Sequence, residues 1–266
     1  MTELTRDAAD ARKPYDVRFE WGAAGAAALA PSSSCLVVVD VLSFSTSVTV
    51  AVEAGTRVYP CAWRDETAAA FAREHQAELA VGRRAASDGR PWSLSPAALR
   101  RAPFTPRLVL PSPNGSAICA SAAGGGGATV IAGCLRNAVA VGRFLYEAAG
   151  TVAVIAAGER WPDGSLRPAL EDLLGAGAVI AALVGCGVRV LSPEAEAARA
   201  CFEGTADIAA AVAGSVSGRE LADGGFGDDV AIAVESGSCP LVPVLADGAF
   251  TAAGGSFIDR VAGNAR

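Results

Sequence analysis

The chain of 266 residues is long enough to bury a substantial hydrophobic core, as one large domain or as two small ones. Its 28 acidic residues outnumber its 22 lysines and arginines, so the formal net charge is −6. No basic stripe is present, and we therefore expect no nucleic-acid partner. Because the net charge repels anions, an anionic ligand would require a local cation or a bound metal ion.

Seven cysteines are scattered along the chain, and none is paired as CxxC. This pattern predicts reduced thiols in a cytoplasmic protein rather than a disulfide framework. No signal peptide is visible. The longest uncharged stretch near a predicted helix, at 173–188, is shorter than the roughly 20 strongly apolar residues of a membrane span. We therefore expect no membrane partner.

Residues 1–14 are polar and of mixed charge, which predicts a flexible N-terminal tail before a single domain at 15–266. Apolar and polar residues alternate from Tyr15 to Trp21, as in a half-buried strand. Continuous apolar runs then predict strands covered on both faces, at 36–41, 107–111, 128–132, 152–157 and 187–191. Helical patterns lie between them, at 45–54, 64–78, 115–123, 136–149, 170–185, 194–202 and 205–213.

This alternation of strands and helices predicts an α/β fold of three layers, with helices on both sides of a largely parallel or mixed sheet. The pattern changes near the C-terminus. There Asp228 is placed to cap a short helix through Val234. The stretch PLVPVLADGAF, at 240–250, then predicts a strand, an Asp-Gly turn and an antiparallel strand.

The residues that many hydrolases use for catalysis are missing. His75 is the single histidine, and it falls in a segment that looks like an exposed amphipathic helix. A Ser-His-Asp triad and a multi-histidine zinc site are therefore not expected. No cysteine has an arginine six positions later, and no GxxxxGK[ST] loop occurs. What remains is carboxylates, hydroxyls and amides at strand ends, where open α/β sheets bind ligands.

One such strand end carries Asp40, with hydroxyl groups at Ser43, Ser45 and Thr46 before the next helix. Backbone N–H groups at the start of that helix are suited to hold an anion. A second explanation needs no ligand, because an acid and hydroxyls in this position also cap a helix. The residues alone do not decide between the two.

A second strand end carries SPNGSAIC, at 112–119. Asn114 and Gly115 allow a tight turn, and Ser116 opens a helix whose first amides would again be free for an anion. A simple turn is the alternative. A third strand end is followed by Arg160, which could pair with a phosphate or sulfonate or lie on the plain surface.

The fourth stretch is the acidic pair Glu171 and Asp172 at the start of an otherwise apolar helix. Acids in a first turn complement the helix dipole, which is the alternative explanation. Oxygen ligands from Asp40, Glu171 and Asp172 would suit Mg²⁺, because this ion takes few carboxylates and keeps several waters.

In their order and spacing, these stretches resemble the family of 2-phosphosulfolactate phosphatases, the ComB-like proteins. The matching pieces are VVVDVLSFSTSVTVAVEAG, SPNGSAIC, CLRNAVAVGRFL, VIAAGERW, LEDLLGAGAVIAAL and PLVPVLADG. The resemblance implies a three-layer ComB-like α/β fold. It also implies Mg²⁺-dependent hydrolysis of 2-phospho-3-sulfolactate to sulfolactate and phosphate, a step in coenzyme M biosynthesis.

The chain departs from the family pattern at Ser43, where many members have arginine. Gly82-Arg83-Arg84 looks like a variant of a Gly-Glu-Arg stretch of the family, and Arg84 is the candidate to carry part of the missing charge. A related phosphorylated hydroxy acid is therefore an alternative substrate.

Together these residues suggest metal-assisted attack by water on a phosphate monoester. Asp40, Glu171 and Asp172 would hold Mg²⁺ as catalytic groups, joined by Asn114. The remaining candidates would bind the substrate's oxyanions; they are Ser43, Ser45, Thr46, Arg84, Gly115, Ser116 and Arg160.

Two rival hypotheses remain open. Asp40 could be a covalent nucleophile, although Leu42 stands where phosphatases of that type usually carry a second acid. The chain could also be a non-catalytic protein that binds a small anion. Its Ala- and Gly-rich helices could pack within one chain or between two, so a homodimer is possible.

Overall fold

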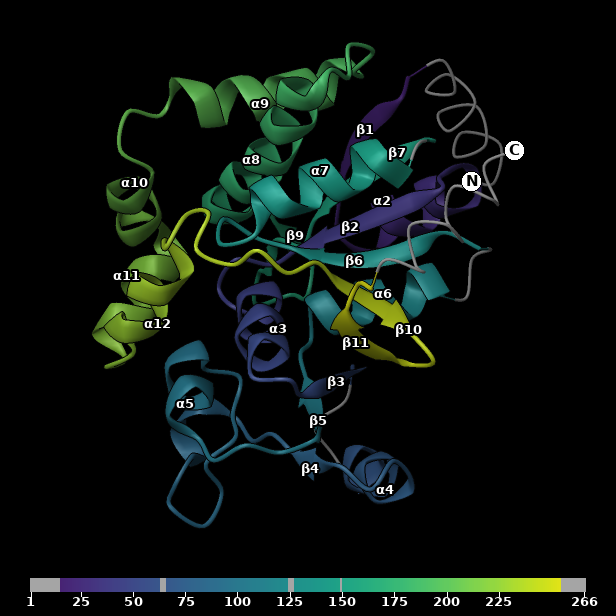
Figure 1. Cartoon of the computed structure of the whole chain (residues 1–266). Coiled ribbons are helices and arrows are strands. Elements are labelled where there is room, and N and C mark those ends of the chain that lie inside the picture. The colour runs from purple at the N-terminus through teal and green to yellow at the C-terminus, as the bar shows by residue number, and fades with distance from the viewer. Residues whose placement is uncertain (1–14, 63–65, 124–126, 149, 255–266) are drawn as a thin grey trace.

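The structure is a computed structural model that describes residues 15–62, 66–123, 127–148 and 150–254 (Figure 1). The predicted tail at 1–14 lies outside these residues, as do the predicted start of the helix at 64 and the predicted end of another at 149. No helix in the described part of the chain has the length and apolar character needed to cross a bilayer.

A group of four parallel strands forms one half of the sheet. They lie in the order β1 (Val17–Trp21), β7 (Val152–Ala156), β2 (Cys35–Val39) and β6 (Thr129–Gly133). All of β2 and β7 is buried, as continuous apolar runs predict. Leu36 and Val38 contact one hydrophobic core, and Val37 and Val39 contact another on the opposite face.

A second group of parallel strands consists of β3 (Arg57–Cys61), β5 (Arg107–Pro111) and β4 (Glu78–Leu79). The antiparallel hairpin of β10 (Pro243–Ala246) and β11 (Ala249–Ala252) joins it to the first group. One residue pair makes each junction, Val244 with Ile131 and Phe250 with Val58. The two junctions and the hairpin itself are antiparallel, so the direction reverses three times, the two groups run in opposite directions and the described strands form a mixed sheet.

Helices cover both faces of the first group, which confirms the three-layer α/β prediction (Figure 1). Around Val37 and Val39 pack α7 (Ala138–Ala148), α8 (Leu170–Cys186) and α9 (Pro193–Gly204). On the opposite face, around Leu36 and Val38, pack α2 (Gly22–Leu29), α3 (Phe44–Glu53) and α6 (Gly115–Ala123). On the second group, α4 (Glu66–Glu74) packs over Tyr59 and Val109.

A column of short helices lies along one side of the molecule (Figure 1). It consists of α10 (Ile208–Gly214), α11 (Val216–Asp223) and α12 (Gly227–Ala233), with α5 (Pro96–Arg101) next to α12. The predicted cap Asp228 lies inside the first turn of α12, and Phe226 occupies the capping position. The Asp-Gly turn is confirmed: Asp247 and Gly248 have φ values of 50° and 77°, as a tight hairpin requires.

The predicted strand at 187–191 is wrong. Gly187, with φ 124°, ends α8, and Ser192 caps α9 through a hydrogen bond from Ala195 N. These residues are therefore a short connection between two helices. Its single sheet contact is an isolated bridge from Leu191 to Val17. The prediction relied on apolar composition alone. It did not recognise that Gly187 ends one helix and Ser192 begins the next, so that only a short connection lies between them.

Candidate active site

Asp40 directly follows β2 and is buried. Its carboxylate accepts two backbone hydrogen bonds: Phe44 N donates to Oδ1 at 3.0 Å, and Gly115 N donates to Oδ2 at 3.0 Å. Phe44 is the first residue of α3, so Asp40 does satisfy a helix-start amide, as the capping explanation requires. The second bond goes further, because it brings the start of α6 against the end of β2.

Gly115 makes this approach possible because it has no side chain. A Cβ atom there would lie 2.9 Å from Asp40 Oδ2 and 2.7 Å from Phe44 Cγ, closer than any real Cβ tolerates. The next two amides of α6, at Ser116 and Ala117, have no acceptor among the described residues. The predicted amide-rich helix start therefore lies beside Asp40 and is partly engaged by it.

Asp172 lies on the other side of the β2 end, in the first turn of α8. Its Oδ1 accepts from Val41 N at 2.7 Å, and its Oδ2 accepts from Gly158 N at 2.8 Å. Gly158 has a φ of 66°, which favours glycine. Asp172 is thus fixed between the loops that follow β2 and β7, and its placement next to Asp40 agrees with the strand-end prediction.

Glu171 is buried beside these two acids, and its carboxylate makes no hydrogen bond to any described residue. A fourth acid, Glu159, accepts a hydrogen bond from Asn114 Nδ2 at 3.0 Å. Sequence reasoning did not single out Glu159, although it stands next to Arg160 in the quoted stretch. The site therefore gathers four carboxyl groups from the ends of two strands and the start of one helix.

Burial and the repulsion between neighbouring acids raise the pKa values of Asp40, Asp172 and Glu159. Burial raises the pKa of Asp40, against the effects of the two backbone amides and of Arg83. The pKa of Asp172 lies well above its usual value because of burial first and the charges of Asp40 and Glu171 next. Burial, with the charge of Asp40, raises the pKa of Glu159 to about 7.

This surplus of buried negative charge, supplied by oxygen donors, fits a hard divalent cation. Among the described residues, no three acids, cysteines or histidines lie close enough together to enclose a metal ion. The geometry thus fits an ion that takes one or two carboxylates and completes its shell with waters and a substrate oxygen, which is how Mg²⁺ commonly binds.

The hydroxyls of Ser45, Thr46 and Ser116 serve the fold. Each donates to a backbone carbonyl oxygen: Ser45 to Val38 at 2.9 Å, Thr46 to Val41 at 2.8 Å and Ser116 to Leu110 at 3.2 Å. These are the contacts that the turn and cap explanations predict. The expected role of these hydroxyls as substrate donors gains no support from the geometry.

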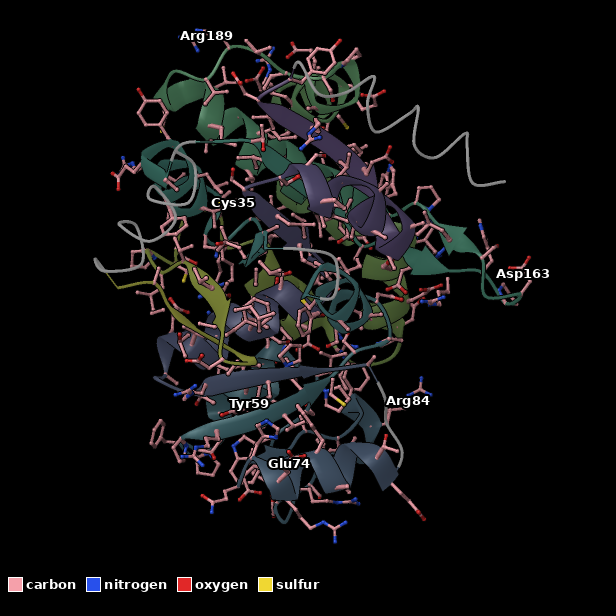
Figure 2. The ribbon with its side chains drawn as sticks, turned by 90° about the vertical axis from the view of Figure 1, so that its right-hand side faces the viewer. Cys35, Tyr59, Glu74, Arg84, Asp163 and Arg189 are labelled. Carbon is pink, nitrogen blue, oxygen red and sulfur yellow. The ribbon has the colours of Figure 1, made fainter. Side chains whose placement is uncertain are left out.

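The cation beside the site is Arg83 rather than the expected Arg84. Arg83 Nη2 donates to Ser43 Oγ at 2.5 Å, and its Nε donates to Asp229 Oδ2 at 2.9 Å. Arg84 is exposed and points away from the body of the protein (Figure 2). The two arginines are adjacent in the sequence, so residue type alone could not tell which one faces inward.

Arg160 lies in a small exposed hairpin of β8 (Glu159–Arg160) and β9 (Leu166–Arg167). Its guanidinium donates to the carbonyl oxygens of Gly164 at 3.2 Å and Pro113 at 3.4 Å. It borders a pocket of 200 Å³ that Asn114 and Glu159 also line. Asp163 lies at the far tip of the hairpin, away from the site (Figure 2). Arg160 therefore stands at the mouth of a pocket next to the acids.

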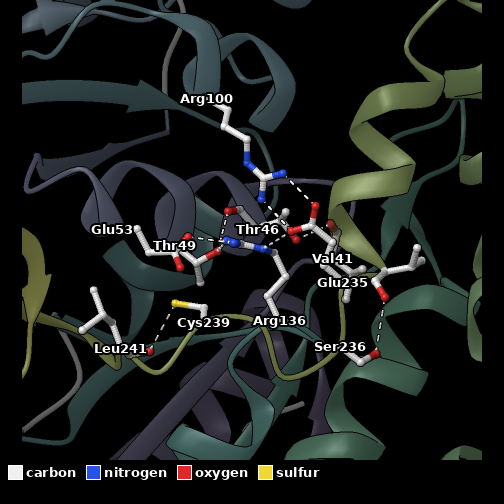
Figure 3. Close-up of polar contacts among 11 residues, drawn as sticks. Val41, Thr46, Thr49, Glu53, Arg100, Arg136, Glu235, Ser236, Cys239 and Leu241 are labelled. Atoms are coloured by element: carbon white, nitrogen blue, oxygen red, sulfur yellow. Dashed lines mark hydrogen bonds and ion pairs between the residues drawn. The ribbon is translucent and has the colours of Figure 1, made fainter.

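A buried arginine that the sequence did not single out fixes α3 from its other end (Figure 3). Arg136 donates to Thr49 Oγ1 and to Glu53 Oε2, both at 2.7 Å, and its Nε lies 3.4 Å from Glu235 Oε2. Glu235 also accepts two bonds from Arg100, at 2.7 and 2.6 Å. This network ties α3, α5 and the segment after α12 together. In the sequence, the network is indicated only weakly, by a single arginine that follows an apolar strand.

The single histidine takes no part in the site. His75 follows the end of α4 and packs against Phe71 and Tyr59, with ring centroids 4.2 and 4.6 Å away. Its Nδ1 lies 2.9 Å from Phe71 O. The side chain is half-buried rather than solvated as expected. Its place on the outer face of the second strand group agrees with a non-catalytic histidine.

Fold and site together define a three-layer α/β protein whose carboxylates gather beyond the carboxyl ends of its strands. The sequence profile of the 2-phosphosulpholactate phosphatase family matches residues 26–248. The chain therefore belongs to this family of phosphoric monoester hydrolases. A comparison with curated proteins found no match.

Proposed function

We propose that this protein hydrolyses 2-phospho-3-sulfolactate, or a closely related phosphorylated hydroxy acid, to the hydroxy acid and phosphate in a Mg²⁺-dependent reaction. This would serve coenzyme M biosynthesis in the cytoplasm. Family membership supports the reaction class. The seven cysteines are free thiols, which is compatible with a reducing compartment.

One observation carries the proposal. Asp40 and Asp172 flank the end of β2, and each is held by two backbone amides that leave the other lone pairs of its oxygens free for a ligand. Glu171 adds a carboxylate with no partner among the described residues. Such a fixed set of acids is costly in an empty site and is stabilised when a cation binds.

One or two of the carboxylates of Asp40, Glu171 and Asp172 would hold the Mg²⁺, which when bound would polarise a phosphate oxygen and offset the charge of the phosphate. The amide N–H groups of Ser116 and Ala117 at the start of α6 are free to donate hydrogen bonds to phosphate oxygens. Next to them, Asn114 would help to orient the attacking water and the Glu159 carboxylate would receive its proton. These roles need positioning and charge stabilisation, which dominate phosphoryl transfer.

A phosphate-release assay with 2-phosphosulfolactate tests the proposal directly. We expect turnover with added Mg²⁺, none after EDTA treatment and recovery when Mg²⁺ is restored. Asp40→Asn and Glu171→Gln should lower kcat by at least about a hundredfold, because each removes a charge from the site. Unchanged activity in Asp40→Asn would remove the central residue from the proposal.

The same assay, with a trapping step, distinguishes water from Asp40 as the nucleophile. Both oxygens of Asp40 already accept a backbone N–H, which lowers the reactivity of the carboxylate and favours water. With hydroxylamine in the reaction, we expect no hydroxamate at Asp40 by peptide mass analysis. A hydroxamate at that position would establish the covalent route instead.

A further inference from the structure

Arg83 is a cation beside the acidic site. It is held there by Ser43 and Asp229, which are both distant from Arg83 in the sequence. It belongs to a short 3-10 turn, Arg83–Ala85, between β4 and α5. Its side chain is 19% exposed, so solvent and small solutes can reach it. The charge of Arg83 acts to lower the pKa of Asp40, against the larger effect of burial.

The guanidinium of Arg83 is oriented by two contacts. Its Nε donates to Asp229 Oδ2 at 2.9 Å, and its Nη2 donates to Ser43 Oγ at 2.5 Å. Asp229 is itself held, because its Oδ1 accepts from Ser95 Oγ at 2.5 Å and from Ala97 N at 3.1 Å. With its side chain only 1% exposed, Asp229 acts as a buried anchor for a partly exposed cation.

These contacts leave part of the guanidinium available. An arginine has five N–H donors, and Nη1, which carries two of them, has no partner among the described residues. Arg83 also lines a pocket of 380 Å³, together with its neighbour Arg84 and with residues from the 220–226 stretch of the helical column, among them Glu220. A rigidly held arginine with free donors at a pocket wall is suited to bind an oxyanion bidentately.

We propose that Arg83, held in place by Asp229, binds the carboxylate or sulfonate of the substrate that is not hydrolysed, and so sets the specificity of the site. The proposal rests on the proposed function. The phosphate group has other partners in the site, namely the start of α6 and the acids that would hold Mg²⁺. Arg83 contacts Ser43, three residues beyond Asp40 in the sequence, and the non-reacting anion would lie beside this contact.

Kinetics test the role of Arg83. With 2-phosphosulfolactate, Arg83→Gln should raise KM roughly ten- to a hundredfold with kcat within about threefold, because it removes binding that is equal in ground and transition states. Asp229→Asn should also raise KM, but by a smaller factor. The asparagine amide would present either a donor or a weaker acceptor to the Nε–H of Arg83, which would then be held less firmly. Arg90→Gln, an exposed arginine of the same loop, is the control and should behave as wild type.

Direct binding separates this proposal from the proposed function. Calorimetry with sulfolactate, lactate and isethionate presents both anions, the carboxylate alone and the sulfonate alone. We expect wild type to bind sulfolactate and Arg83→Gln to bind it at least about tenfold more weakly. The single-anion ligand whose affinity falls in Arg83→Gln then identifies the group that Arg83 holds. Thermal denaturation of both variants excludes unfolding as the cause.

Each outcome is decisive. A wild-type protein that binds sulfolactate but releases no phosphate contradicts the proposed function. The role of Arg83 is then decided by comparing sulfolactate binding in wild type and Arg83→Gln. Equal sulfolactate binding by wild type and Arg83→Gln overturns the proposal, as does a wild type that does not bind sulfolactate. A collapse of kcat at unchanged KM in Arg83→Gln also overturns it, because Arg83 would then act on the reacting phosphate.

Discussion

Gly115 donates its backbone N–H to the carboxylate of Asp40 at 3.0 Å, across a sequence separation of 75 residues. This bond connects the end of β5 with the end of β2, although the two strands belong to groups that run in opposite directions in the sheet. Between the two groups lie the C-terminal hairpin and two junctions of a single residue pair each, so this hydrogen bond joins parts of the fold that the sheet connects only narrowly.

Gly115→Ala should damage the site more than its small size suggests. The added methyl group would meet Phe44 and Asp40, so α6 must move away from the end of β2. We expect a loss of about 1–3 kcal/mol in unfolding free energy and a fall in kcat of tenfold or more. Gly214→Ala, where nothing lies within 4 Å, is the control and should change neither quantity. Full activity in Gly115→Ala would contradict the importance of this contact.

Glu171→Gln should separate stability from function. The Glu171 carboxylate has no hydrogen-bond partner among the described residues and lies beside Asp40 and Asp172, whose pKa values its charge raises. Removing this charge should increase unfolding free energy in EDTA by on the order of 1 kcal/mol while activity is lost. Calorimetric melting with and without Mg²⁺ measures both effects, since the ion should stabilise wild type more than the variant. A variant less stable than wild type in EDTA would contradict the repulsion.

Glu159 should make stability fall as the pH rises. Its pKa in the folded protein is about 7, above the ordinary value of 4.5, so the fold favours the protonated form. That stabilisation is complete below about pH 4.5 and is lost as the pH rises through about 7. Each unit of pKa difference corresponds to about 1.4 kcal/mol.

Urea denaturation in EDTA, from about pH 5 to about pH 8, tests this dependence. The Glu159→Gln side chain does not titrate. The unfolding free energy of wild type should therefore fall with increasing pH relative to that of Glu159→Gln. Glu147→Gln, on the exposed side of α7, is the matched control and should show no such trend. If the difference in unfolding free energy between wild type and Glu159→Gln did not change with pH, the pKa of Glu159 would not be raised in the folded protein.

Arg136→Gln should be among the most destabilising single substitutions. It leaves the Glu53 and Glu235 carboxylates without their buried partner and removes the donor to Thr49. Losing these charge-assisted hydrogen bonds should cost about 1.5–3 kcal/mol, because both carboxylates are partly exposed and Glu235 keeps its bonds from Arg100. Because α3 begins at the active site, kcat should fall as well. Arg101→Gln removes an exposed pair with Asp228 instead, and its unfolding free energy should match wild type. An equally small effect for both would refute a stabilising role for the Arg136 network.

Sequence reasoning placed the strands of the first group well, because β2 and β7 are buried on both faces and have continuous apolar sequences. It missed β3, where Arg57 is exposed and Pro60 interrupts the pattern. For the site, the strand-end rule brought Asp40 and Asp172 together correctly. It could not find Arg83 and Asp229, because their contact spans 146 residues and depends on how the helical column packs beside α5. A single sequence contains no local signal for such a contact.

The C-terminal hairpin has a consequence for how the chain is made. During synthesis, β6 and β3 leave the ribosome long before β10 and β11, which join them through Val244 and Phe250. Until those last strands emerge, each half of the sheet has an open edge able to pair with other chains. Nascent chains that stall before Pro243 should therefore aggregate or recruit chaperones, and completion of the sheet becomes a late step of folding.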